Sequence, residues 1–276
     1  MKKILSVSLL VVGLFFACKN KGENSKKLDV ETKPKLLIIE NITIDSSYLG
    51  CNTKNENCTY ISLKYPRIKQ APIQAFMDSV NLAIDNFVMA PIFETKQKTP
   101  ADLINYFFDN YKKMEVGEFK LPWYLNRNII FNNLGNGIFT LNCNENAFYG
   151  GAHDSWNTEF YNFDSLGKKI LLNDLFNENW ENRLLEVGER EFKIQQKIHP
   201  ETPLYETPYF DFPFTENRQF KFANNFLIKN EGLYFFYNNY EIASFAAGQS
   251  EFTIKWKDLK ALINPNGPLA FMLDSL

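Results

Sequence analysis

The sequence has few histidines and cysteines and no excess of basic residues. Only two of its 276 residues are histidine, His153 and His199. It contains neither a His-x-x-x-His pair nor a glycine-rich phosphate loop, and its four cysteines form no paired metal-binding motif. We therefore expect no metal site and no cofactor. Thirty basic residues against 32 acidic ones give a formal charge of −2, so no nucleic-acid partner is expected.

A long apolar run is also lacking, since a membrane-spanning helix needs roughly twenty such residues. The N-terminal run covers only residues 4–16, follows two lysines, and ends at Ala17 and Cys18. Such a run is typical of a signal peptide. A small residue before Cys18 resembles a lipobox, so we expect residues 1–18 to be a lipoprotein signal peptide. A lipid on Cys18 would then attach the protein to a membrane. The alternative is an ordinary secretory signal peptide.

Residues 19–33 have almost no apolar side chains. A segment of this composition cannot bury enough surface to offset its ordering entropy, which predicts a flexible tether. We expect folded structure over residues 34–265 and a short tail over 266–276. The predicted location is the cell envelope, as a membrane-anchored lipoprotein that faces the periplasm or the cell exterior.

Three cysteines remain after Cys18. Cys51 and Cys58 flank a turn-rich hexapeptide. Because disulfides form and persist outside the cytoplasm, we expect a disulfide across this loop. Cys143 lies in an apolar, strand-like run and is most simply a small buried residue.

The residue pattern in the first half of the expected folded region predicts a hairpin and two helices. Residues 36–44 and 59–65 are typical of strands, the second of which stops at Pro66. Apolar residues recur at helical spacing over 73–89. Thr99 begins a second helix, because its side chain can cap the helix and Pro100 fits the first turn.

The second half predicts a strand-rich region. Residues 124–132, 137–145 and 155–163 are strand-like and separated by Asn-Gly and Gly-Gly turns, as in an antiparallel meander. A helix over 179–198, a hairpin over 225–237, a strand over 251–255 and a short helix over 257–263 follow. The expected fold is α+β, with antiparallel sheets and helices packed on one face. We expect two sub-domains in sequence, 34–120 and 121–265.

The most distinctive stretch runs from Phe148 to Asp164 and contains Gly150, Gly151 and His153. Histidine titrates near neutrality and suits general-base chemistry. Asp154, Glu159 or Asp164 would then orient it. Neighbouring side chains of an extended strand point to opposite faces, however, so His153 and Asp154 would not pair. Ser155 lacks a nucleophile elbow. The simpler interpretation is a glycine-built turn that His153 holds by hydrogen bonds.

Residues 199–220 interleave four prolines with six aromatic residues. A stiff loop of this length could present its aromatic side chains to a partner. The alternative is a strap that packs these side chains onto the core.

Two motif groups carry a resemblance to a known family. Tyr149-Gly-Gly-Ala-His153, Tyr161-Asn-Phe-Asp164, Leu172-Asn-Asp-Leu-Phe176 and Glu231–Ala243 resemble the C-terminal domain of the lysozyme-sensing anti-sigma factor RsiV. Residues 60–66 and the following helix resemble the N-terminal domain that RsiV shares with the peptidoglycan deacetylase PdaC. The resemblance implies a non-enzymatic envelope module that binds a lysozyme-like protein or a peptidoglycan fragment.

The ligand contacts expected from this resemblance and from aromatic residues in loops are Tyr149, His153, Trp156, Tyr205, Tyr209 and Phe210. Two alternatives remain open at this point. The first is an envelope glycan hydrolase or deacetylase-associated enzyme that uses His153, Asp154 and Glu159. The second is a scaffold lipoprotein without a ligand cleft.

Overall fold

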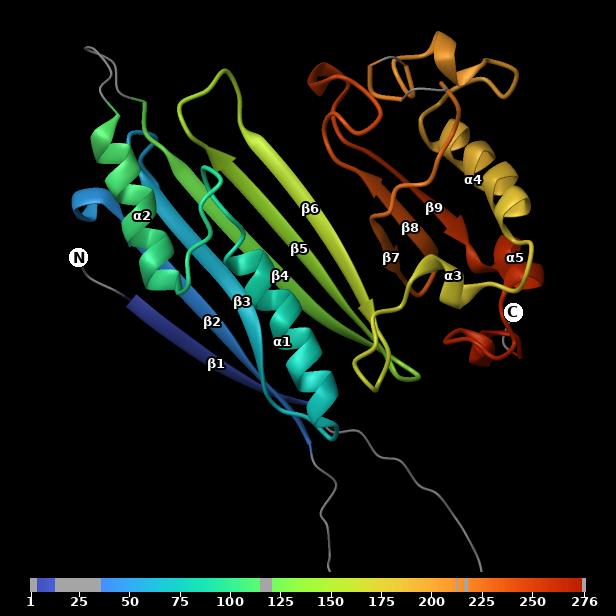
Figure 1. Ribbon diagram of the computed structural model, residues 1–276, viewed down its shortest axis with the longest axis horizontal. Helices are drawn as coiled ribbons and strands as arrows, with labels where there is room; N and C mark the ends of the chain where they lie inside the picture. Colours follow the sequence, from blue (N-terminus) through green and yellow to red (C-terminus); the bar gives the residue numbers. More distant parts are fainter. Residues whose placement is uncertain (1–3, 13–35, 115–120, 212, 216–217, 275–276) are drawn as a thin grey trace, which may run out of the picture.

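The computed structural model describes residues 4–12, 36–114, 121–211, 213–215 and 218–274. Cys18 and the predicted tether lie outside these ranges. The described chain forms two units, each with its own sheet (Figure 1). The α+β fold class is confirmed. No helix in these ranges is long and apolar enough to span a membrane.

The first unit is built on a sheet with the strand order β1-β2-β3-β4-β5-β6. Its strands are β1 (Ile4–Val12), β2 (Leu37–Ser47), β3 (Tyr60–Gln70), β4 (Tyr124–Gly135), β5 (Ile138–Phe148) and β6 (Ser155–Phe163). Helices α1 (Gln74–Val88) and α2 (Pro100–Lys113) cover one face of this sheet, as Figure 1 shows. Thr99 caps α2 as predicted, because its side chain accepts a hydrogen bond from the backbone N–H of Asp102.

The hairpin of β2 and β3 agrees with the sequence-based expectation. The two strands are antiparallel, and a disulfide joins Cys51 to Cys58 in the loop between them. The predicted disulfide is thus confirmed. β3 does not stop at Pro66 but continues to Gln70, with Pro66 paired opposite Asn41.

The predicted boundary at residues 120 and 121 falls within this sheet. β3 and β4 pair in parallel, with Tyr60 opposite Tyr124 and Lys64 opposite Asn128. The helical connection through α1 and α2 brings these strands together, as parallel neighbours require. The sheet is therefore mixed rather than wholly antiparallel, and the first unit extends to the end of β6 at Phe163.

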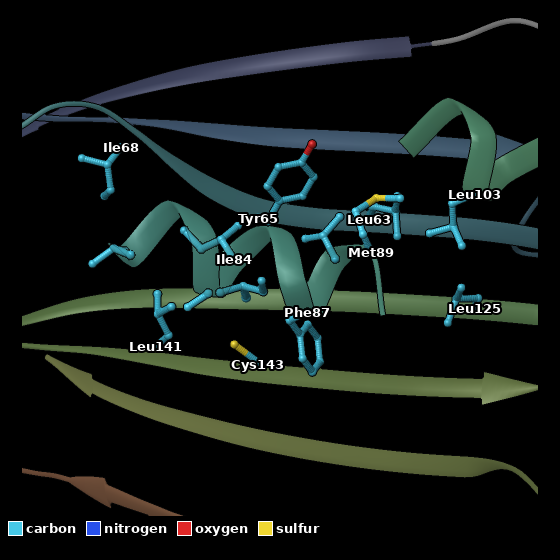
Figure 2. Close-up of a cluster of buried hydrophobic side chains, with 14 of the residues drawn as sticks. Leu63, Tyr65, Ile68, Ile84, Phe87, Met89, Leu103, Leu125, Leu141 and Cys143 are labelled. Carbon is cyan, nitrogen blue, oxygen red and sulfur yellow. The ribbon is translucent and has the colours of Figure 1, made fainter. Parts of the chain in front are cut away.

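Apolar side chains fill the space between the sheet and the two helices. Figure 2 shows Leu63, Leu125 and Leu141 from the strands facing Ile84 and Phe87 from α1. Cys143 is fully buried in this core and has a free thiol, as expected for a small apolar residue. Burial raises the pKa of this thiol far above its ordinary value, so it stays protonated at neutral pH.

One ion pair lies inside this core. Arg127 on β4 is 2% exposed, and its Nε donates to Glu145 Oε2 on β5 at 2.6 Å. Its Nη1 donates to the carbonyl oxygens of Val88 and Ala90 at 2.8 and 2.9 Å. Arg127 therefore joins the sheet to the C-terminal end of α1, where backbone carbonyls lack helical partners.

The second unit contains β7 (Phe226–Ile228), β8 (Gly232–Tyr237) and β9 (Ser250–Lys255) in an antiparallel sheet. The helices of this unit are α3 (Leu172–Leu175), α4 (Glu181–Gln195) and α5 (Trp256–Leu259), with short 3-10 turns at 204–206, 245–247, 260–262 and 270–272. A further 3-10 turn, at 48–50, follows β2 in the first unit. A separate apolar core holds α4 against this sheet; at its centre, Phe192 contacts Phe210 and Phe252.

The segment Ile4–Val12 falls within the predicted signal peptide. In the structure it forms the outer strand β1, paired antiparallel with β2 from Ile4 opposite Asp45 to Val12 opposite Leu37. Cys18 lies between Val12 and Leu37 in the sequence. The predicted cleavage before Cys18 would therefore separate β1 from β2.

Side-chain amides join the two units where β6 and β7 approach each other. Asn162 on β6 is 2% exposed. Its Nδ2 donates to the carbonyl oxygen of Phe226 at 2.9 Å, and the N–H of Ile228 donates to its Oδ1 at 2.8 Å. In the other direction, the N–H groups of Thr158 and Phe160 on β6 donate to Asn238 and Asn225, both at 2.8 Å.

We expect Arg127→Ala to lower the free energy of unfolding by about 3–5 kcal/mol, because it leaves Glu145 and two carbonyls without their buried partner. Denaturant unfolding followed by circular dichroism measures this loss. The matched control is Arg67→Ala, which removes a half-exposed pair with Asp85 and should cost about 1 kcal/mol or less. Equal losses for the two variants would contradict the assigned role of Arg127.

Candidate functional site: the interunit groove

A concave surface lies where the second unit meets the helix-free face of the large sheet. We call it the interunit groove; its volume is about 400 Å³. Its lining residues are Asn126, Asn128, Asn142, Asn144, Glu145, Asn146, Trp156, Thr158, Phe160, Leu227, Lys229, Tyr234, Phe236 and Gln249. They come from both units, so the amide hydrogen bonds at β6 and β7 determine the shape of the groove.

Five asparagines form the floor of this groove. They alternate with core residues along β4 and β5, since successive side chains of a strand point to opposite faces. The strand register places Asn126 opposite Asn146, and Asn128 opposite Asn144. The floor is thus a two-strand block of carboxamides, each of which offers both a hydrogen-bond donor and an acceptor.

Hydrogen bonds within the floor fix the orientation of its amides. Asn144 Nδ2 donates to Asn142 Oδ1 at 2.8 Å, and Thr158 Oγ1 donates to Asn144 Oδ1 at 3.1 Å. Asn126 Nδ2 donates to the Tyr60 hydroxyl at 3.2 Å. A polar ligand would therefore meet ordered amides and lose little side-chain entropy on binding.

Aromatic side chains form the walls. Trp156 on β6 is 49% exposed, and its Cα lies opposite that of Asn146. From the second unit, Phe236 and Tyr234 pack with Phe160 of β6. The Tyr234 ring carries Lys229 Nζ 3.3 Å from its centroid. Exposed aromatic rings beside fixed amides offer a ligand both apolar contact and directed hydrogen bonds.

The polar surface continues beyond the groove. A second hollow of about 540 Å³ lies over β2 and β3 and shares Asn126 with the interunit groove. Ser62 and Lys64 of β3 line it together with the disulfide loop residues Asn52 and Thr53. The two hollows therefore meet at Asn126.

His153 lies outside the groove lining. It is exposed, its Nδ1 lies 2.9 Å from the carbonyl oxygen of Asp154, and its ring stacks on Phe245 at 3.7 Å. Its Nε2 lies 3.3 Å from the Tyr240 hydroxyl. His153 thus connects the glycine turn to the 240–247 loop of the second unit. Gly150 in this turn has a φ of +80°, and a Cβ there would lie 3.0 Å from Trp123 Nε1.

The acidic candidates make separate contacts. Asp154 is hydrogen-bonded to Tyr124; burial and this bond raise the pKa of Tyr124 to about 12. Glu159 accepts from Asn157 and Tyr161 on the helix-covered face of β6. Asp164 accepts from the backbone of the turn that follows β6. These groups and His153 therefore do not converge as a catalytic site requires.

Burial contradicts one predicted ligand contact, Phe210, and limits another, Tyr149. Phe210 is 0% exposed within the core of the second unit and has no surface to offer a ligand. Tyr149 is half-buried among Phe93, Phe107 and Trp123. Burial raises the pKa of its hydroxyl above the ordinary value. Both residues were predicted as contacts because sequence alone does not separate loop aromatics that are exposed from those that pack inward.

The proline-rich segment packs largely as a strap. Tyr209 contacts Phe192 of α4, and its hydroxyl donates to Gln196 Oε1 at 3.2 Å. Tyr205 remains 50% exposed, but it does not line the interunit groove. Of the six predicted ligand contacts, Trp156 is the one that lines this groove.

Among the described residues, no group of three or more histidine, cysteine, aspartate or glutamate side chains could hold a metal ion. Sequence reasoning also missed the asparagine floor. A signal for it existed in Asn126-Arg-Asn128 and Asn142-Cys-Asn144-Glu-Asn146, where asparagines alternate along two predicted strands that are neighbours.

Comparisons with known proteins agree with this two-unit organisation. Residues 52–155 match the family model described as Deacetylase PdaC. Residues 173–257 match the model described as Protein of unknown function (DUF3298). The chain carries a PdaC domain followed by a DUF3298 domain. A comparison with curated protein sequences gave no significant match.

Two solved structures share the fold of this chain. One is a member of the DUF3298 family from Bacteroides fragilis, with 17% identity, a TM-score of 0.65, and coverage of 87% of this chain and 98% of that one. The other is a DUF3298 family protein from Pseudomonas aeruginosa PAO1, with 16% identity, a TM-score of 0.61, and coverage of 83% and 95%. Both similarities extend over the PdaC and DUF3298 domains.

We expect Asn162→Ala to lower the free energy of unfolding by about 2–4 kcal/mol, because a backbone N–H and a carbonyl of β7 lose their buried partner. Denaturant unfolding measures the change. Asn132→Ala serves as the control, since Asn132 is exposed on β4 and its loss should change stability by less than about 0.5 kcal/mol. A neutral Asn162→Ala would show that this amide does not hold the PdaC and DUF3298 domains together.

Proposed function

We propose that this protein is a non-enzymatic, lipid-anchored binding module of the cell envelope. Its ligand is a peptidoglycan-type glycan that binds in the interunit groove. The observation that carries this proposal is the floor of five asparagines beside the exposed ring of Trp156. Cys18 carries the lipid, and the PdaC and DUF3298 domains face the periplasm or the cell exterior.

The chemistry of the groove fits the polar groups and the ring face of a sugar. Sugar hydroxyl and acetamido groups both donate and accept hydrogen bonds, as carboxamides do. The apolar face of a sugar ring needs a flat apolar partner, and Trp156 supplies one. The second hollow, which meets the groove at Asn126, gives room for a chain of several sugars.

The resemblance to RsiV suggests a lysozyme-like protein as another ligand. A protein–protein interface of standard size buries roughly 800 Å² on each side and favours a broad surface with an apolar centre. The asparagine floor is instead polar and concave. We therefore favour the glycan, and lysozyme is the second arm of the test.

An envelope hydrolase or deacetylase needs an acid, a base or a metal that meets the substrate. PdaC is the name of a deacetylase family, but His153, Glu159 and Asp164 have separate partners. No observation on this chain favours the enzyme over the binding module.

We expect Trp156→Ala to weaken the binding of a soluble tetrasaccharide fragment of peptidoglycan roughly tenfold, since loss of one aromatic contact costs about 1–2 kcal/mol. Isothermal titration calorimetry measures the dissociation constant. Asn144→Ala should weaken binding to a similar extent, because it removes an amide from the centre of the floor.

Tyr205→Ala is the matched control. Its side chain is as exposed as that of Trp156 but lies outside the groove, so its dissociation constant should equal that of the unmodified protein. Weaker binding by Tyr205→Ala with an unchanged Trp156→Ala would move the site to the strap. Binding to lysozyme without binding to the fragment would refute the glycan as ligand.

A further inference from the structure

The outer strands of the two sheets differ in what pairs with their free edges. An unpaired edge exposes backbone N–H and carbonyl groups that can pair with another strand. Among the described strands, the outer edges are those of β1 in the large sheet, of β6 at its other side, and of β7 and β9 in the small sheet. Side-chain amides of the same chain occupy three of these four edges.

The edge of β9 shows this most clearly. Gln195 of α4 donates to the carbonyl oxygen of Thr253 at 3.0 Å and accepts from the N–H of the same residue at 3.1 Å. Gln196 donates to the carbonyl oxygen of Glu251 at 3.0 Å. Asn225 and Asn238 occupy the edge of β6, and Asn162 occupies the edge of β7. Each carboxamide takes the place of a neighbouring strand.

The remaining edge is different because a whole strand covers it. β1 pairs with β2 over nine residues without interruption, from Ile4 opposite Asp45 to Val12 opposite Leu37. This strand belongs to the segment that is removed if the chain is cleaved before Cys18. The processed protein then exposes β2, which contains neither lysine nor proline. Its two charged side chains are those of Glu40, which pairs with Lys69 of β3, and Asp45.

We propose that the exposed edge of β2 pairs with β2 of a second copy, so that two large sheets join into one continuous sheet. The pairing of β1 shows that this edge accepts an antiparallel strand over its length. Two copies related by a two-fold axis also pair antiparallel. The inference rests on removal of residues 1–17, which belongs to the proposed function, but not on glycan binding.

Side chains on β2 support this choice of occupant. Ile42 and Ile44 lie on the helix-covered side, contact the core and remain only half-buried. With the two-fold axis at Thr43, Ile42 would lie opposite Ile44 of the partner subunit, and the pair would bury apolar surface that the edge otherwise exposes. Thr43 would lie opposite its own copy, on the helix-free side where Lys64 is its neighbour on β3.

The length of chain before β2 is compatible with a common membrane. With the two-fold axis at Thr43, two antiparallel copies of β2 place their N-terminal ends about 40 Å from each other. Residues 19–33 of each copy can reach about 50 Å when extended. Both lipid-bearing Cys18 residues can therefore lie in one membrane surface.

The test uses the full chain expressed with its signal peptide and extracted from the membrane, with Thr43→Cys as the reporter. Directly opposed strand residues have Cβ atoms about 5 Å from each other, so mild oxidation should give a species of twice the monomer mass on a non-reducing gel. The control is Asn132→Cys, an exposed residue of β4 away from this edge, which should give no disulfide-linked dimer on the gel.

A second variant distinguishes stable pairing of β2 from a disulfide that forms during a chance collision. Thr43→Asp places two carboxylates opposite each other on the axis, and like charges in this position oppose pairing. We expect it to weaken self-association at least tenfold in analytical ultracentrifugation while the circular dichroism spectrum stays unchanged. Asn132→Asp should leave the association unchanged.

Three outcomes would overturn the inference. They are a monomer for the unmodified protein at all concentrations, a Thr43→Cys cross-link to a different protein, and retention of residues 1–17 by mass spectrometry. Calorimetry on the same samples measures glycan binding. A protein that dimerises without binding the glycan would contradict only the proposed ligand, and a protein that binds the glycan as a monomer would contradict only the proposed pairing of β2.

Discussion

The position of the two units depends on hydrogen bonds from side-chain amides to strand edges. A carboxamide presents a donor and an acceptor on one planar group, as a peptide unit does, and it can therefore satisfy an N–H and a carbonyl of one strand. Asn162 does this for β7, and Asn225 does it for β6. Because amides intervene, β6 and β7 belong to separate sheets, and the groove between the units has residues of both as its lining.

Local features of the fold could be predicted from the sequence. Helical spacing predicted α1, the Thr99 cap predicted the start of α2, and turn residues predicted the meander of β4, β5 and β6. The parallel pairing of β3 with β4 could not be predicted, because the two strands are separated by two helices and share no turn. The predicted boundary at 120 and 121 followed from that omission, since composition changes where the helices end although the sheet continues.

The candidate site was harder to predict than the fold for a chemical reason. His153 and the carboxylates near it attract attention because titratable groups are the usual sign of catalysis. Asparagine does not titrate, and single asparagines are ordinary turn residues. Only the register of β4 against β5 shows that five asparagines form one surface. They are Asn126, Asn128, Asn142, Asn144 and Asn146. Burial decided the other cases: Phe210 and Trp156 are both aromatic, but only Trp156 is exposed.

Burial also determines the protonation of several tyrosines of the large sheet and of the groove wall. Burial is the first cause for Tyr124, Tyr161 and Tyr234, and it raises each pKa. A raised pKa keeps a phenol neutral at physiological pH, whereas a general base must lose its proton readily. Neutral phenols remain hydrogen-bond donors. Tyr234 in the groove wall donates its hydroxyl proton to Glu251, so it offers a ligand its aromatic ring beside the hydrogen-bonding amides of the asparagine floor.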